Sequence, residues 1–187
     1  MKLSILICSI PERLSQLSKL TEGLTHKDVE VIYLGDNLEM TVGEKRNWLL
    51  KISHGDYVVF IDDDDEVSDN YIEKILEATE QETDCVCFGV KIWHRNKWKD
   101  VDYSIKYKMD ANFGDRFLRM PNHIMAVKRE LALDAMFPKM VAYEDAAYAG
   151  RLKLKTETKI SDVLYLYTPG KSWKRNRHYE NWFNRNR

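Results

Sequence analysis

Cysteine is scarce in this sequence, and no long hydrophobic run is present. Only three of the 187 residues are cysteines, so a disulfide framework is not expected. We expect Cys85 and Cys87 to point to opposite faces of one strand, and no second Cys or His pair lies at zinc-ligand spacing. These features favour a reduced, cytoplasmic setting. No apolar run approaches the roughly 18 residues that a membrane span needs.

An excess of either charge is also absent. Lys and Arg number 29, Asp and Glu number 30, and the net charge is −1. The chain as a whole is therefore not a polycation built to coat nucleic acid. The apolar run after Lys2 stops at Glu12, which is too early for a signal peptide. Hydrophobic residues still make up 44%, enough for a core in a single domain of ordinary length.

Apolar runs alternate with helical patterns through the first 80 residues. We expect strands over residues 3–8, 29–34 and 56–61. A helical pattern follows each of these strands. Strand and helix in strict alternation predict an α/β fold with a parallel sheet and right-handed crossovers.

Local signals set the expected ends of two helices. Thr41 and Glu44 have capping-box spacing at the start of a helix over 41–52, and Gly55 is expected to end that helix. Ser68 is expected to cap the next helix.

The second half has weaker patterns and predicts a mixed sheet. We expect strands over 85–93, 98–105, 123–127 and 159–167, and a helix over 144–155. The stretch 106–121 shows no clear periodicity of hydrophobic residues. Without a linker or a repeat, residues 1–170 are expected to form one domain, followed by a tail over 171–187.

Four adjacent aspartates, Asp62 to Asp65, follow the third strand directly. Ligands of parallel α/β sheets bind beyond the carboxyl ends of the strands, where these side chains would lie. Adjacent carboxylates repel one another, and a hard divalent cation such as Mg²⁺ or Mn²⁺ would relieve that repulsion. The alternative is a solvated acidic turn that precedes a helix.

The segment Phe60–Glu66 resembles the D-x-D region of GT-A glycosyltransferases, most closely those of glycosyltransferase family 2. Further segments are similar to that family in order and spacing: Leu3–Ser9, Glu30–Asn37, Arg46–Asn47 and Gly55–Tyr57. The resemblance implies a Rossmann-like, three-layer α/β/α fold with a mixed, mostly parallel central sheet. It further implies a nucleotide-binding half over 1–92 and an acceptor half over 93–170.

The resemblance also implies an activity, the transfer of a sugar from a nucleotide-sugar, with UDP the commonest donor nucleotide. The donor-binding positions that it implies are Ser9, Pro11, Arg13, Asp36, Arg46, Asp62 and Asp63. A lone arginine such as Arg13 is more often a surface charge on a helix, and Asp36 could simply form a turn with Asn37. Mn²⁺ or Mg²⁺ would be held by Asp64 with Asp62, and His178 is a further candidate ligand.

Tyr143-Glu144-Asp145 is similar to the family's Glu-Asp motif, whose aspartate is the usual general base. The resemblance therefore implies catalytic roles for Asp145 and Glu144 and inversion at the anomeric carbon. Carboxylates in a first helical turn would also simply favour the helix dipole. The signature of processive members is missing, so a single transfer is expected. Residues 168–172 depart from the family's Arg-x-His segment.

The tail over 171–187 combines six basic residues and one acid with interleaved aromatic side chains. This composition suits packing on the domain, a lid over a diphosphate, or contact with a polyanion. The acceptor could be a saccharide, a lipid-linked sugar or nucleic acid, and a second subunit could complete the site. Two alternatives are a nucleic-acid-binding module and a nucleotidyltransferase, although the latter usually has a glycine-rich loop that Ser9–Arg13 lacks.

Overall fold

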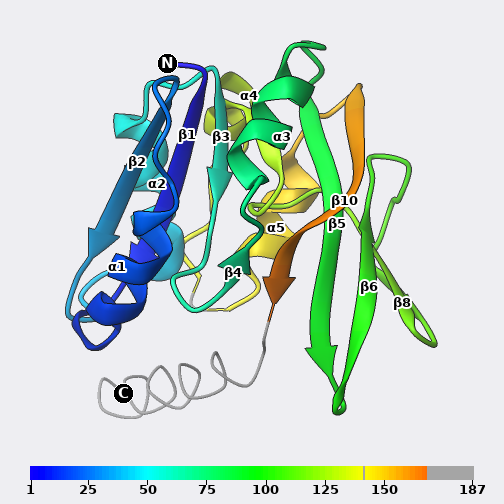
Figure 1. Cartoon of the computed structure of the whole chain (residues 1–187), viewed down its shortest axis with the longest axis horizontal. Helices are drawn as coiled ribbons and strands as arrows, with labels where there is room; N and C mark the ends of the chain where they lie inside the picture. The colour runs from blue at the N-terminus through cyan, green and yellow to red at the C-terminus, as the bar shows by residue number, and fades with distance from the viewer. Residues whose placement is uncertain (141, 168–187) are drawn as a thin grey trace.

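The computed structural model describes residues 1–140 and 142–167. The predicted tail over 171–187, and with it the candidate ligand His178, lies outside the described residues. Within the described part, the strands form one ten-stranded mixed sheet (Figure 1). Its main path runs β2-β1-β3-β9-β5-β6-β8-β7, and β10 pairs with both β5 and β4.

The N-terminal half has the predicted alternation of strands and helices. Its parallel strands are β1 (Leu3–Ser9), β2 (Val29–Gly35) and β3 (Tyr57–Phe60). Its helices are η1 (Pro11–Arg13), α1 (Leu14–Glu22), α2 (Val42–Ile52) and α3 (Tyr71–Thr79). All four residues of β3 are buried, as expected for a central strand covered on both faces.

The capping box at Thr41 and Glu44 is confirmed, but two other predicted helix ends are wrong. Helix α2 ends at Ile52, and Gly55 instead lies against β1, where a Cβ atom would come within 2.6 Å of the Ser4 nitrogen. Glycine is needed there for close approach and not for a helix stop. Helix α3 has Asn70 at its N-cap, so Ser68 is not the cap residue.

The second half completes the sheet with strands of both directions. They are β4 (Glu66–Val67), β5 (Cys85–His94), β6 (Lys97–Tyr103), β7 (Ala111–Phe113), β8 (Arg116–Arg119), β9 (Ala126–Lys128) and β10 (Glu157–Tyr167). Two helices accompany them, α4 (Arg129–Ala135) and α5 (Glu144–Arg151). The helix expected over 144–155 thus ends at Arg151. The strand expected over 123–127 begins only at Ala126 and ends at Lys128.

Cys85 and Cys87 lie on the same face of β5, with their Sγ atoms 3.8 Å apart. The expectation of opposite faces was wrong because side chains in a strand repeat every two residues.

Helices cover both faces of the sheet, which confirms the expected mixed, mostly parallel α/β architecture. Helices α2, α4 and α5 pack together on one face, whereas α3 packs against β5 and β10 (Figure 1). The described helices are too short to span a bilayer. The carboxyl ends of β1, β2 and β3 meet at one edge, and the acidic loop begins there.

Candidate active site

The loop after β3 buries three of its four aspartates. Asp63, Asp64 and Asp65 are only 3%, 6% and 7% exposed. A tight turn forms the loop, since the Asp65 N–H donates to the Asp62 carbonyl at 3.0 Å. Burying several carboxylates is costly unless each is paired, so their partners define the chemistry of the site.

Arg13 and Ser9 hold Asp63 at the end of β1. The Ser9 hydroxyl donates to Asp63 Oδ2 at 2.7 Å, and Arg13 Nη1 donates to Asp63 Oδ1 at 2.6 Å. The same Arg13 nitrogen lies 3.1 Å from Asp64 Oδ2. One guanidinium therefore offsets two neighbouring carboxylates, which lie where the sequence predicted donor and metal binding.

Arg46 links the acidic loop to helix α5. Its guanidinium is buried and lies 3.0 Å from Asp62 Oδ1 and 2.8 Å from Glu144 Oε1. The rings of Phe60 and Phe137 lie 5.8 and 5.3 Å from the guanidinium carbon. Burial alone would lower the pKa of Arg46, but the charges of Asp62 and Glu144 outweigh it and raise the pKa. Arg46 therefore stays charged and joins two candidate site residues that are distant in sequence.

Tyr165, on β10, fixes the other side of the loop and was not predicted. Its hydroxyl accepts the Asp62 N–H at 3.2 Å and donates to Asp65 Oδ2 at 2.7 Å. Burial, followed by the nearby charges of Asp65 and Asp62, raises the pKa of Tyr165 far above its ordinary value. The hydroxyl is therefore a permanent donor, and it holds the loop from a strand near the end of the described part of the chain.

Lys45 connects the ends of β1 and β2. Its ammonium group donates to the Ser9 carbonyl at 2.9 Å and pairs with the carboxylate of Asp36. The Met40 N–H donates to the same carboxylate at 2.6 Å. Burial opposes ionisation of Asp36, but the bonds from Lys45 and Met40 outweigh it and lower its pKa. Asp36 is therefore ionised and fixed in place.

The hollow between β1, α2 and the acidic loop is almost filled. About 20 Å³ remains among side chains that include Arg13, Lys45 and Asp63. That volume suits a water molecule and not a nucleoside. Pro11 lies nearby on the exposed η1 turn, and it makes no side-chain bond to the other candidates that could fix its role.

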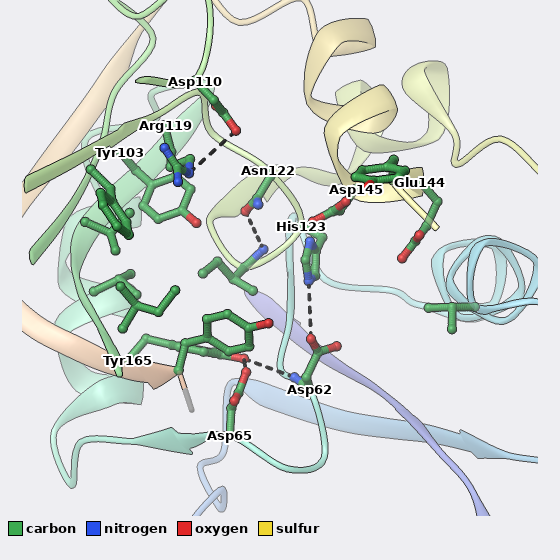
Figure 2. A pocket seen from close by; sticks show the side chains of 18 of the residues that line it. Asp62, Asp65, Tyr103, Asp110, Arg119, Asn122, His123, Glu144, Asp145 and Tyr165 are labelled. Atoms are coloured by element: carbon green, nitrogen blue, oxygen red, sulfur yellow. Dashed lines mark hydrogen bonds and ion pairs between the residues drawn. The ribbon is translucent and has the colours of Figure 1, made fainter. Parts of the chain in front are cut away.

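A larger cavity of about 410 Å³ opens on the other side of Asp62 (Figure 2). Five acidic residues line it: Asp62, Asp65, Asp110, Glu144 and Asp145. The other lining residues include apolar side chains of β5 and β6, tyrosines, a histidine and a basic residue: Val90, Ile92, Val101, Tyr103, Tyr165, Tyr167, His123 and Arg119. The volume suits one or two sugar rings, and tyrosine rings are suitable surfaces for them.

Asp145 and Glu144 have different surroundings in the first turn of α5. Glu144 is buried and bound to Arg46, whereas Asp145 is half-buried and faces the cavity (Figure 2). A carboxylate that borders a cavity can accept a proton from a bound hydroxyl, but one paired with a buried guanidinium is held in place. His123 also borders the cavity; its Nε2 lies 3.8 Å from Asp62 Oδ2, too far for a hydrogen bond.

The acidic loop has the donor chemistry that a hard divalent cation requires. Asp62 and Asp64 offer carboxylate oxygens, and Mg²⁺ and Mn²⁺ prefer such ligands. Among residues 1–140 and 142–167, no three of these aspartates converge on one point. Metal sites that also use substrate phosphates need only one or two carboxylates, so the residues fit that kind of site.

Solved structures with the same fold include TarS of S. aureus. The chain aligns to TarS residues 1–349 in complex with UDP-GlcNAc at 16% identity and a TM-score of 0.67, covering 90% of this chain and 58% of that one. The TarS complex with UDP gives 16% identity and a TM-score of 0.67, covering 93% and 63%. The chain therefore spans about 60% of the length of these structures. At such low identity the likeness shows the fold alone.

Family membership follows from the sequence match. Among curated proteins, none matches this chain. The model of the family described as glycosyl transferase family 2 matches residues 9–144, which include the last residue of β1, the acidic loop and the first residue of α5. The chain therefore belongs to glycosyl transferase family 2.

Proposed function

We propose that this protein transfers a single sugar from a nucleotide-sugar to an acceptor hydroxyl. One arrangement carries the proposal: Asp62 and Asp65 of the acidic loop and the cavity-facing Asp145 border the same 410 Å³ cavity, whereas Asp63 and Asp64 line a neighbouring hollow against α1 and α3. Family membership supports sugar transfer as the reaction class. UDP is the proposed donor nucleotide, since the TarS structures with the same fold hold UDP-GlcNAc and UDP.

The donor would lie across the ends of β1, β2 and β3. Ser9, Asp36 and Asp63 line this edge, and Arg13 must leave the nearly filled hollow for a nucleoside to enter. A displaced Arg13 could then pair with the diphosphate, because guanidinium groups bind phosphate oxygens well. Binding of the donor would therefore break the contact between Arg13 and Asp64.

Asp64, with Asp62, would hold Mn²⁺ or Mg²⁺, which when bound offsets the charge that develops on the departing diphosphate. Arg46 would keep Asp62 oriented, because the guanidinium is itself held in place by its second bond, to Glu144. Tyr165 would keep the loop closed through Asp65. These contacts preorganise the carboxylates, so little rearrangement is required as the reaction proceeds.

Asp145 is the proposed general base. It would take the proton of the acceptor hydroxyl as that oxygen attacks the anomeric carbon and the carbon–phosphate oxygen bond breaks. With a base and no nucleophile from the protein, the configuration at the anomeric carbon inverts. The acceptor would occupy the 410 Å³ cavity, and a saccharide is the proposed acceptor class. Three free cysteines support a reducing, cytoplasmic setting.

A thermal-shift panel tests the proposal. The full chain is heated with UDP, GDP or a UDP-sugar, each with and without Mn²⁺. We expect one nucleotide to raise the melting temperature strongly only when Mn²⁺ is present, because ligands that bind the native state stabilise it by about 2.7 kcal/mol at 100 times Kd.

Asp64→Asn should remove the Mn²⁺-dependent part of that shift. The matched control is Asp134→Asn, which changes an exposed aspartate on α4 and should leave the shift intact. If Asp64→Asn responded like the unaltered chain, the assigned site would be wrong.

A further inference from the structure

A second cluster of chemically reactive side chains lies away from the candidate active site. Cys85 and Cys87 are at the start of β5 and are completely buried, and Glu157 is at the start of β10. The two strands are parallel, and Cys85 is in register with Glu157. The cluster therefore lies at the end of these strands opposite Ile92 and Tyr167, which border the large cavity.

The ligand atoms of the three side chains lie close to one another. The two Sγ atoms are 3.8 Å apart, and Cys87 Sγ lies 3.4 Å from Glu157 Oε2. One ligand atom from each residue lies within 4.8 Å of the others. Side chains two apart on a strand share a face but need not lean together, so this convergence is a specific feature of the site.

We propose that Cys85, Cys87 and Glu157 bind a thiophilic divalent cation of the zinc class. Zinc binds thiolate sulfur at about 2.3 Å and carboxylate oxygen at about 2.0 Å in tetrahedral geometry, so ligand pairs should be separated by about 3.8 Å for S···S and about 3.5 Å for S···O. The observed separations of 3.8 and 3.4 Å match both values.

A second layer of contacts orients the carboxylate of Glu157. The hydroxyl of Ser104, a fully buried residue, donates to Oε1 at 2.6 Å, and the Ile105 N–H donates to Oε2 at 2.9 Å. Outer partners of this kind fix ligand direction at metal centres. Tetrahedral zinc needs a fourth ligand, which would be a water molecule reaching the site beside the half-buried Glu157.

Buried cysteines also occur as small apolar core residues, with no metal. If the two cysteines were only apolar core residues, the Glu157 carboxylate would not need to face Cys87. That carboxylate is also held in place by Ser104 and Ile105. The metal would join β5, β10 and the turn after β6, which together support one wall of the large cavity. Its proposed role is therefore structural, and it is distinct from the hard-cation site at Asp64.

Cobalt substitution tests the site directly. The full chain is unfolded, refolded under reducing conditions with Co²⁺, and passed through a desalting column. We expect one cobalt per chain and the near-ultraviolet absorption of thiolate-to-cobalt charge transfer, which carboxylate sites cannot produce.

Cys85→Ser and Cys87→Ser should each abolish that absorption, and Cys8→Ser is the matched control that should retain it. Ser104→Ala keeps all three ligands and should weaken cobalt affinity by about 10–100-fold. The proposal fails if the unaltered chain shows no charge-transfer band, or if Cys8→Ser removes the band as fully as the other two. Asp64→Asn should leave the band unchanged, which separates this outcome from failure of the proposed transferase.

Discussion

The hydroxyl of Tyr165 donates a 2.7 Å hydrogen bond to Asp65, a residue 100 positions earlier in the chain. The same oxygen accepts the N–H of Asp62. A single side chain of β10 thus satisfies both ends of the acidic turn. The position of the aspartates depends on a strand formed late in the sequence as well as on β3, which precedes them.

Tyr165→Phe should destabilise the fold and weaken donor binding together. The substitution leaves the Asp65 carboxylate and the Asp62 N–H without this partner, at a cost of about 1–3 kcal/mol. Urea unfolding measures the stability, and the nucleotide thermal shift measures binding. Tyr71→Phe is the control: within the described part of the chain the buried Tyr71 hydroxyl has no hydrogen-bond partner, so its removal should cost nothing. Equal losses in both variants would contradict the assigned role.

Arg46→Met should be among the most destabilising substitutions in this protein. It leaves the carboxylates of Asp62 and Glu144 near the core without their shared guanidinium, and breaking such a buried pair costs about 3–5 kcal/mol. Chemical denaturation gives the change in the free energy of unfolding. Arg151→Met removes an exposed arginine from the last turn of α5 and should change stability by less than about 0.5 kcal/mol. A loss of similar size in both would show that the Arg46 pairs do not stabilise the fold.

Asp145→Asn should mainly lower the rate of sugar transfer, whereas Glu144→Gln should mainly lower the stability of the fold. Asp145→Asn should lower kcat by about 10²–10⁴-fold while donor binding and stability stay close to normal, because it removes only the proton acceptor. Glu144→Gln should mainly lower stability, because it weakens the bond to Arg46. Sugar-transfer assays and urea unfolding on both variants distinguish the roles. A reversed pattern would assign the base to Glu144.

Acid should lower the stability of the fold through Asp102, which lies on β6. Burial opposes ionisation of this carboxyl, but bonds from Lys159, Tyr107 and Arg116 outweigh it and lower its pKa from 3.8 to about 2. A group with a lowered folded-state pKa stabilises the protein above its ordinary value, and that contribution is lost as the pH falls from about 3.8 to about 2. Asp102→Asn should therefore lose stability at neutral pH and show a shallower decline over this window in urea titrations. An unchanged decline would rule out Asp102 as its source.

Local sequence patterns predicted most elements of the N-terminal half but not all of their ends. Apolar runs mark β1, β2 and β3, and the Thr41–Glu44 box marks the start of α2, because each signal depends on residues close in sequence. Gly55 was misassigned because its constraint comes from Ser4, on a neighbouring strand. Strands β7 and β8 were missed because they are short and mostly unburied, so they carry no clear alternation.

The site could be predicted only in part for the same reason. The positions of the aspartates follow from the end of β3, but the partners of these aspartates come from other elements: Arg13 from η1, Arg46 from α2 and Tyr165 from β10. No sequence period indicates such contacts. A buried tyrosine at the end of a predicted strand was the one available signal for Tyr165, and it equally suits an ordinary core position.

The short strand β9 lies antiparallel between β3 and β5, pairing Val127 with both Val58 and Cys85. During synthesis on the ribosome, β3 and β5 both emerge before the strand that joins them. Until residue 128 has left the exit tunnel, both strands present bare backbone edges that invite pairing with other nascent chains. Translation speed and chaperone access across residues 94–128 would thus govern the yield of correctly folded protein.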